Sequence, residues 1–155
     1  MPKIDIAKLQ PLRRTRYPGD LRKVTKGYQR VAVGDAAGLT QFGVNRTVLE
    51  PGAATSLRHW HENEDEFVIV LEGEVVLVDD NGETPMHAGD CAGFRAGDAN
   101  GHTIINRSER PAILFEIGTR LADEIGHYPD VDLLYKKIAG EIHFTRRDGT
   151  AISET

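Results

Sequence analysis

Apolar residues gather in short runs through the middle of the chain, and turn-forming residues separate these runs. The clearest runs are 67–71 and 75–78, and a further run at 42–49 precedes them. Their β-branched and aromatic residues favour strands. Both faces of the first two runs are apolar, so we expect these strands to be covered on both sides, as in a two-sheet sandwich. Further strands are expected at 57–61, 84–87, 91–94, 102–106 and 112–117.

Turn signals lie at the ends of these runs. Asn81-Gly82 is a pair that two-residue hairpin turns prefer, and Gly73 marks another tight connection. The segment 34–38 is expected to be a loop, and no long stretch has the 3.6-residue period of an amphipathic helix. Many short strands with turns between them predict an all-β sandwich or barrel.

The length of 155 residues predicts one domain with two extensions. Residues 1–30 begin with a Lys/Arg-rich stretch that has no clean period. We expect an arm that wraps its own domain or a partner's, and a loosely ordered terminus fits equally well. The barrel is placed at 31–120. The segment 121–155 is expected to be a tail that packs on the barrel or crosses to a neighbour.

The composition excludes several classes of protein. The net charge is −5 with acids and bases mixed along the chain, which argues against a nucleic-acid partner. Cys91 is the single cysteine, so no internal disulfide forms, and we interpret it as a small core residue rather than a nucleophile. No apolar stretch approaches the ~20 residues of a membrane span, and the N-terminus lacks a signal-peptide pattern. A soluble, cytoplasmic protein is therefore expected.

Three histidines and a glutamate form the most distinctive polar group. His59 and His61 are two positions apart, so on a strand they project from one face, about 6–7 Å apart. Glu66 begins the next strand and lies beside them if the two strands pair. His102 begins a much later strand and meets them only if a barrel closes. Imidazole and carboxylate together are ligands for transition metals.

Two other interpretations of these residues stay open. His59 and His61, taken alone, fit two surface positions of an ordinary strand. Glu64 or Asp65 also fits the role of carboxylate ligand in place of Glu66. The presence of all three histidines and the glutamate together favours metal binding over both of these interpretations.

The spacing of these residues resembles the two motifs of the cupin superfamily. The first, G-x5-H-x-H-x3,4-E-x6-G, corresponds to Gly52, His59, His61, Glu66 and Gly73, with one extra residue before the histidines. The second, G-x5-P-x-G-x2-H-x3-N, corresponds to Gly89, Arg95, Gly97, His102 and Asn106. Arg95 replaces the proline, and four residues rather than two separate Gly97 from His102. The resemblance covers roughly residues 40–118 and extends to small single-domain bacterial cupins with no agreed substrate.

This resemblance implies a double-stranded β-helix, the jelly-roll barrel, with a metal ion inside. By the resemblance the ligands are His59, His61, Glu66 and His102. One divalent transition metal ion is implied, and the ligand set does not choose among Fe, Mn, Ni, Co and Zn. Four protein ligands leave two octahedral positions for water, oxygen or a chelating substrate. The resemblance also implies a homodimer.

Substrate-binding residues are harder to place from sequence. Arginine matches the geometry of carboxylates, so Arg46, Arg95, Arg107 and Arg120 are candidate anion clamps, although plain solvent exposure explains each of them too. Asn106 resembles the family's structural asparagine and also shares the strand face of His102. We select Arg46, Arg95 and Asn106 as candidate substrate-binding residues.

The function predicted from these residues is metal-dependent chemistry on a small, oxygen-rich organic substrate. The metal would act as Lewis acid or oxygen binder in a dioxygenase, isomerase, lyase or decarboxylase. The catalytic residues stay unknown, because no acid or base outside the ligands has an assigned place. A non-catalytic module that binds or senses a sugar or carboxylate is the main alternative, and a structural or storage protein is a third.

Overall fold

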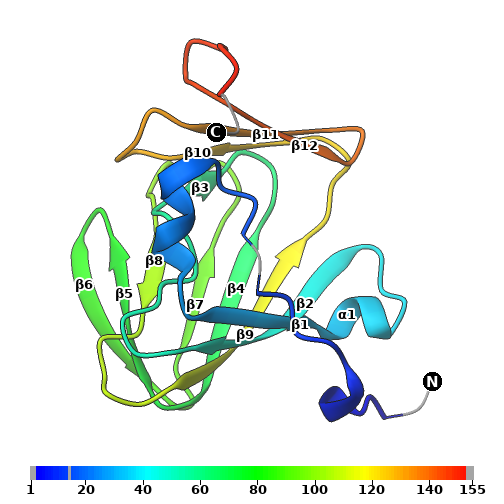
Figure 1. Cartoon of the computed structure of the whole chain (residues 1–155), viewed down its shortest axis with the longest axis vertical. Coiled ribbons are helices and arrows are strands. Elements are labelled where there is room, and N and C mark those ends of the chain that lie inside the picture. Colours follow the sequence, from blue (N-terminus) through cyan, green and yellow to red (C-terminus); the bar gives the residue numbers. More distant parts are fainter. Residues whose placement is uncertain (1–2, 14, 153–155) are drawn as a thin grey trace.

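Eight of the strands between Tyr28 and Thr119 form two antiparallel sheets that face each other (Figure 1). The structure, a computed structural model, describes residues 3–13 and 15–152. The larger sheet has the order β1 (Tyr28–Ala32), β2 (Phe42–Leu49), β9 (Ala112–Thr119), β4 (Glu66–Glu72) and β7 (Cys91–Phe94). The smaller sheet has the order β6 (Gly82–His87), β5 (Glu74–Asp79) and β8 (Thr103–Ile105). The predicted all-β jelly-roll fold is confirmed.

The apolar core lies between these two sheets. Val68 and Val70 alternate with outward residues along β4, and both are buried against Leu114 of the same sheet. Val75 and Ile104 reach them from the smaller sheet. Burial of one such side chain stabilises the fold by roughly 1.5–3 kcal/mol. Packing of this core therefore fixes the relative positions of the strands in the two sheets.

A third sheet lies across one end of the barrel (Figure 1). Its strands have the order β12 (Glu141–Thr145), β11 (Leu134–Ile138), β10 (Glu124–His127) and β3 (Trp60–His61). The C-terminal segment thus returns to the barrel of its own chain, which is one of the two courses expected from sequence. The pairing of β10 with β3 is short, with Gly126 opposite His61 and His127 opposite Trp60.

The N-terminal segment also packs on its own domain. It contains the two 3-10 helices η1 (Ile6–Lys8) and η2 (Gly19–Thr25). Tyr17, between them, is buried in a second apolar cluster with Tyr128 and Leu133 of the C-terminal segment. The arm and the tail therefore meet over the same end of the barrel.

Two local expectations differ from the structure. The segment 34–38 was expected to be a loop, but α1 (Val33–Ala36) is a single helical turn there. Gly34 permits it, because a Cβ at this position would lie 2.8 Å from the backbone nitrogen of Val44. One turn is too short to produce a period in the sequence. The strand β1 was not expected, because long-range pairing with β2 defines it rather than apolar alternation.

The outer face of the larger sheet carries exposed apolar side chains. Phe42, Phe67 and Leu71 are 39%, 41% and 42% exposed. Cys91 is exposed on the same face, so its expected place in the core is wrong. Its register partner Ile69 shows why, since Ile69 alternates with the buried residues Val68 and Val70, and Cys91 lies opposite it on the same outward face. Within the described residues, no helix is long and apolar enough to cross a membrane.

Candidate metal centre

The backbone brings His59 and His102 directly opposite each other. An isolated antiparallel bridge joins them, with hydrogen bonds from His59 N to His102 O at 3.0 Å and from His102 N to His59 O at 2.9 Å. His61 follows two residues later in β3. Three histidines from two distant segments thus share one end of the barrel interior, and closure of the barrel brings His102 there.

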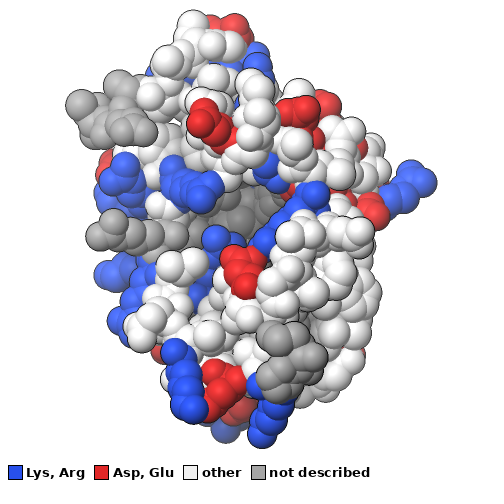
Figure 2. All heavy atoms as spheres, turned by 90° about the vertical axis from the view of Figure 1, so that its right-hand side faces the viewer, with Lys and Arg blue, Asp and Glu red and all other residues white. Residues whose placement is uncertain are grey.

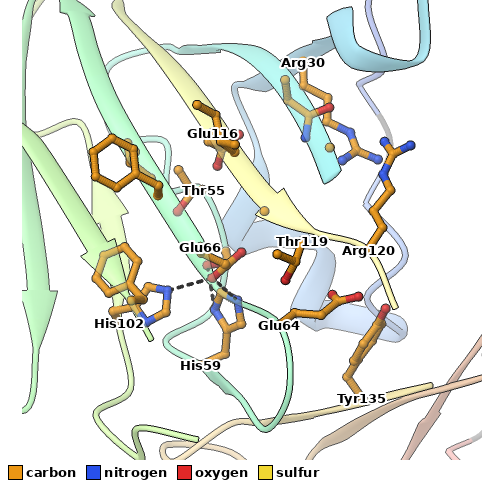
Figure 3. A pocket seen from close by; sticks show the side chains of 18 of the residues that line it. Arg30, Thr55, His59, Glu64, Glu66, His102, Glu116, Thr119, Arg120 and Tyr135 are labelled. Carbon is orange, nitrogen blue, oxygen red and sulfur yellow. Dashed lines mark hydrogen bonds and ion pairs between the residues drawn. The ribbon is translucent and has the colours of Figure 1, made fainter. Parts of the chain in front are cut away.

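Glu66 meets the histidines across the barrel interior. The strand pairing that would have placed Glu66 beside the histidines does not occur, because β4 pairs with β9 and β7 while β3 pairs with β10. Glu66 Oε2 nevertheless lies 2.9 Å from His102 Nε2, 3.6 Å from His59 Nε2 and 3.8 Å from His61 Nε2. Figure 3 shows His59 and His102 directed toward Glu66. One carboxylate oxygen therefore faces three imidazole nitrogens.

The neighbouring acids point elsewhere. Glu64 Oε1 accepts hydrogen bonds from Lys137 Nζ at 2.5 Å and from the backbone nitrogen of Leu121 at 2.7 Å. Asp65 Oδ1 accepts a hydrogen bond from the backbone nitrogen of Ala96 at 2.7 Å. Of the three consecutive acids, Glu66 is the one whose carboxylate contacts the histidines.

Local contacts set the tautomer of His59. Its Nδ1 lies 3.0 Å from the carbonyl oxygen of Leu57, which can only accept, so Nδ1 carries the proton and Nε2 presents a lone pair. Burial is the main reason that the pKa of His59 is lowered to about 4, although the charge of Glu66 opposes this effect. The ring is therefore neutral at physiological pH, which is the protonation state that a metal ligand needs.

The carboxyl group of Glu66 is ionised, whereas the ring of His59 is neutral. Burial alone would raise the pKa of its carboxyl. The hydrogen bond from His102 and the charges of His59 and His61 outweigh burial, and the pKa of Glu66 is lowered well below its usual range. The site therefore combines an ionised carboxylate with neutral imidazole.

Aromatic packing holds two of the rings in place. Phe94 stacks on His102 with ring centroids 3.5 Å apart, and Tyr128 stacks on His59 at 5.8 Å. Trp60 projects away from the group and stacks on His127 at 4.2 Å. This packing limits the rotation of the imidazoles, so the donor atoms keep their mutual positions.

Glu124 is a part of the centre that the sequence did not indicate. Its side chain is fully buried, and it accepts hydrogen bonds from the backbone nitrogens of Glu62 at 2.8 Å and Asn63 at 3.0 Å. Its Oε1 also lies 3.5 Å from Nδ1 of His61, a buried atom with no closer hydrogen-bond partner in the described chain. The carboxylate favours a proton on Nδ1 of His61, which leaves the lone pair of Nε2 available to bind a metal ion. Glu124 lies far along the chain on β10, so no local spacing points to it.

The donor atoms fit a divalent transition metal ion. Ligands at about 2.1 Å from an ion lie about 3.0 Å apart at right angles and about 3.4 Å apart in a tetrahedron. The Oε2-to-Nε2 distances of 2.9–3.8 Å span these values. The donors of His59, His61 and Glu66 also lie within 4.8 Å of one another. This cluster could therefore hold one ion, and Nε2 of His102 is placed to complete the set.

A cavity of about 630 Å³ extends from this centre to the surface. Among the described residues, four cationic side chains line it together with His59 and His102, and they are Arg16, Arg30, Arg120 and Lys137. Figure 2 shows a hollow on the face at the right-hand side of Figure 1, with Lys and Arg side chains along its edges. Arg30 and Arg120 gather on one side of the cavity, away from His102 (Figure 3). The cavity thus has an imidazole end and a cationic end.

The candidate substrate-binding residues have three different surroundings. Arg46 is not among the residues that line the cavity, because it alternates with the inward residues Asn45 and Thr47 on β2. Arg95 lines a smaller cavity of about 280 Å³ on another side of the metal ligands. Asn106 is fully buried, and its amide donates to the carbonyl oxygens of Leu49 and Arg110.

Of the other candidate clamps, only Arg120 reaches the main cavity. Arg107 forms an exposed ion pair with Glu83 instead. Arg30 was missed, because its strand was not recognised from the sequence. Its place opposite Thr47 in the β1–β2 pairing turns it inward.

Comparison with known proteins gives a consistent result. The Cupin domain family pattern matches residues 45–118. A sugar phosphate isomerase from a cupin superfamily of Silicibacter pomeroyi is 48% identical, with a TM-score of 0.95 over 98% of this chain and 97% of that one. A candidate sugar phosphate isomerase of Acidithiobacillus ferrooxidans is 29% identical, with a TM-score of 0.72 over 82% of each chain. The polyketide cyclase RemF of Streptomyces resistomycificus shares the fold at 18% identity, with a TM-score of 0.64 over 77% of this chain and 79% of that one. None of the curated proteins matches the chain.

Proposed function

The chain belongs to the cupin superfamily, and from this premise we propose that it is a metal-dependent isomerase of small phosphorylated sugars. The observation that carries the proposal is the two-ended cavity. One end is lined by the imidazoles of His59 and His102 and the carboxylate of Glu66, and the other end holds arginine side chains. A sugar phosphate has matching ends, since its carbonyl and hydroxyl oxygens sit on adjacent carbons and its phosphate is an anion.

Four residues would hold the metal ion in this proposal, and they are His59, His61, Glu66 and His102. When bound, a divalent ion would supply Lewis acidity toward the carbonyl and hydroxyl oxygens of a substrate. The protein residues do the remaining work. Glu124 and the carbonyl of Leu57 orient two of the imidazoles, and Phe94 and Tyr128 pack against two of the rings.

The cationic end would receive the phosphate. In the described part of the chain, Arg30 makes no side-chain hydrogen bond or ion pair, so its guanidinium is available to an anion. Arg120 is paired with Asp35 at 2.5 Å, and a Cβ at Gly43 would lie only 3.1 Å from its Nε. Gly43 therefore leaves the space in which the Arg120 guanidinium lies. Arginine binds phosphate oxygens in a bidentate manner, which would fix the orientation of the substrate.

The relatives support the choice of substrate class. The Silicibacter pomeroyi protein, described as a sugar phosphate isomerase, aligns over nearly the whole of both chains. The polyketide cyclase supports the fold alone, because its identity to this chain is low. The same barrel serves different chemistries, so the cationic end of the cavity has to carry the argument for a phosphorylated substrate.

A panel of phosphorylated aldoses and ketoses, each paired with its unphosphorylated counterpart, tests the proposal. The protein loaded with Mn²⁺, Fe²⁺, Co²⁺, Ni²⁺ or Zn²⁺ should interconvert at least one phosphorylated pair, and removal of the metal by a chelator should abolish the reaction. Arg30→Gln should raise KM for the phosphorylated substrate about tenfold or more, whereas Arg110→Gln, an exposed residue outside the cavity, should not. Tight binding of a sugar phosphate without turnover would contradict the isomerase and favour a binding module.

We also propose that a second copy of the chain covers the outer face of the larger sheet. Phe42, Phe67 and Leu71 are exposed there, and exposed apolar side chains on one face of a protein favour an interaction site. A symmetric dimer would bury the same patch on both copies.

A further inference from the structure

Glu116 is a carboxyl group inside the cavity that metal binding does not use. It lies on β9 and lines the same cavity as Glu66 and His102. The hydroxyl groups of Tyr28 and Thr47 both donate to its Oε2, the former at 3.1 Å. Its Oε1 has no hydrogen-bond partner among the described residues and is not among the buried atoms that lack one. One oxygen is thus anchored, while the other faces the cavity.

Strand register places Glu116 between the two ends of the cavity. On the β4–β9 pair, Gly118 is opposite Glu66 and Glu116 is opposite Val68, so Glu66 and Glu116 are diagonal neighbours on the inner face, about 7 Å apart. Arg30 projects inward from β1, two strands beyond β9. Figure 3 shows Glu116 beside the cavity between the Glu66 region and Arg30. A sugar phosphate that spans both ends would therefore pass Glu116.

The other acidic side chains among the described residues that line the cavity already contact other groups. Glu66 contacts the three histidines, and Glu64 is paired with Lys137, with both of these side chains largely buried. Burial raises the pKa of the Glu116 carboxyl, an effect that the nearby charge of Glu66 reinforces and the hydrogen bond from Thr47 opposes. A carboxyl with a raised pKa holds a proton more readily than an ordinary carboxylate, which suits a group that accepts a proton and then returns it.

We propose that Glu116 is the acid–base residue that carries the proton between the two carbons of the isomerised substrate. This inference rests on the proposed isomerase function. Oε1 takes the proton from C2 of the aldose, the electron pair of that C–H bond forms the C1–C2 double bond, and the carbonyl pair moves to O1. The proton of the O2 hydroxyl passes to O1. The electron pair left on O2 then forms the carbonyl at C2, while the C1–C2 double-bond pair takes the proton back from Glu116 and forms the new C1–H bond. The oxidation of C2 balances the reduction of C1, so no external oxidant is needed.

A purely structural role for Glu116 makes different predictions. The hydrogen bonds from Tyr28 and Thr47 tie three strands together, so loss of the side chain could act through the fold. Glu116→Gln keeps the size and an acceptor for these hydroxyls. It should lower kcat by about 10²- to 10⁴-fold with little change in KM. It should also abolish deuterium uptake from D2O into substrate, with metal content and unfolding midpoint retained. Glu83→Gln, an exposed carboxylate outside the cavity, should change none of these quantities.

A second experiment tests the reactivity of the Glu116 carboxylate without requiring turnover of a substrate. A three-carbon epoxide that carries a phosphate group should esterify Glu116, because the carboxylate oxygen opens the ring and the resulting alkoxide takes up a proton. Peptide mass spectrometry should locate the adduct at Glu116 in the wild type and find none in Glu116→Gln.

The outcomes separate the two proposals. Isomerisation by the wild type together with an unaffected Glu116→Gln, or with an adduct at another residue, would overturn the role of Glu116 and leave the isomerase standing. An adduct at Glu116 without isomerisation of any sugar phosphate would overturn the isomerase and support Glu116 as the reactive carboxylate of the cavity. Absence of both isomerisation and adduct would overturn both.

Discussion

Glu124→Gln should weaken metal binding although Glu124 is not itself a ligand. Its fully buried carboxylate faces Nδ1 of His61 at 3.5 Å and accepts backbone N–H groups of Glu62 and Asn63. A glutamine amide offers one oxygen and one NH2 group, so it cannot accept with both ends, and one buried donor loses its partner. Residues that orient metal-bound histidines typically contribute 10- to 100-fold to metal affinity.

The expected magnitudes follow from these contacts. The dissociation constant for the metal should rise about 10- to 100-fold, which corresponds to about 1.4–2.8 kcal/mol. The unpaired backbone donor should lower the free energy of unfolding of the metal-free protein by about 1–3 kcal/mol. The first number comes from the lost carboxylate contact with His61, and the second comes from the backbone N–H that is left without a partner.

Two assays separate the effects. Competition with a chromophoric chelator of known affinity gives the metal dissociation constant, and urea unfolding of the metal-free protein gives its stability. Glu141→Gln is the matched control, since this carboxylate lies on the same sheet with its side chain 83% exposed. If Glu124→Gln lowers stability but leaves metal affinity within a factor of about three of the wild type, the carboxylate only supports the fold and the reasoning about His61 fails.

Three further predictions concern pH, packing and assembly. The unfolded chain protonates His59 near pH 6.5, whereas the folded chain protonates it only at about pH 4. The metal-free protein should therefore lose on the order of 3 kcal/mol of stability as pH falls through that window. If urea unfolding of a His59→Gln variant keeps the full pH dependence, His59 is not the cause. Gly101→Ala should destabilise the protein by about 1–3 kcal/mol in thermal unfolding, since its Cβ would lie 2.7 Å from Pro129 Cγ. An unchanged unfolding midpoint would show that the loop around Gly101 moves to make room for the methyl group and would contradict this prediction. Phe67→Lys should convert a dimer to a monomer in sedimentation velocity, and a wild type that sediments as a monomer would contradict the proposed interface.

The barrel strands were predictable because they carry their own local signal. Phe42–Leu49 and Cys91–Phe94 match the expected bounds, because alternation of inward and outward residues and adjacent turn residues define both. The strand expected at 57–61 is limited to Trp60–His61, since its partner β10 covers only two of its residues. Strands that depend on a distant partner, such as Tyr28–Ala32, leave no such signal.

The candidate site divides in the same way. His59 and His61 were found by spacing, because residues two positions apart on an extended chain share a face wherever that segment lies in the fold. Glu66 was found by the resemblance to the family motif, since it lies on a different strand that does not pair with theirs. Glu116 and Glu124 were not found, since their roles arise from sheet register and from a strand that returns from the C-terminal segment. Their burial is invisible in a sequence where charged residues alternate with apolar ones throughout.

Metal stoichiometry tests the central claim most directly. Equilibrium dialysis of the chelator-treated protein against Mn²⁺, with electron paramagnetic resonance of the bound ion, should find one ion per chain. The same experiment on a His59→Ala/His61→Ala double variant, shown by circular dichroism to keep its β-structure, should find none. Equal, substoichiometric binding by the wild type and this variant would contradict the metal centre and the function proposed from it.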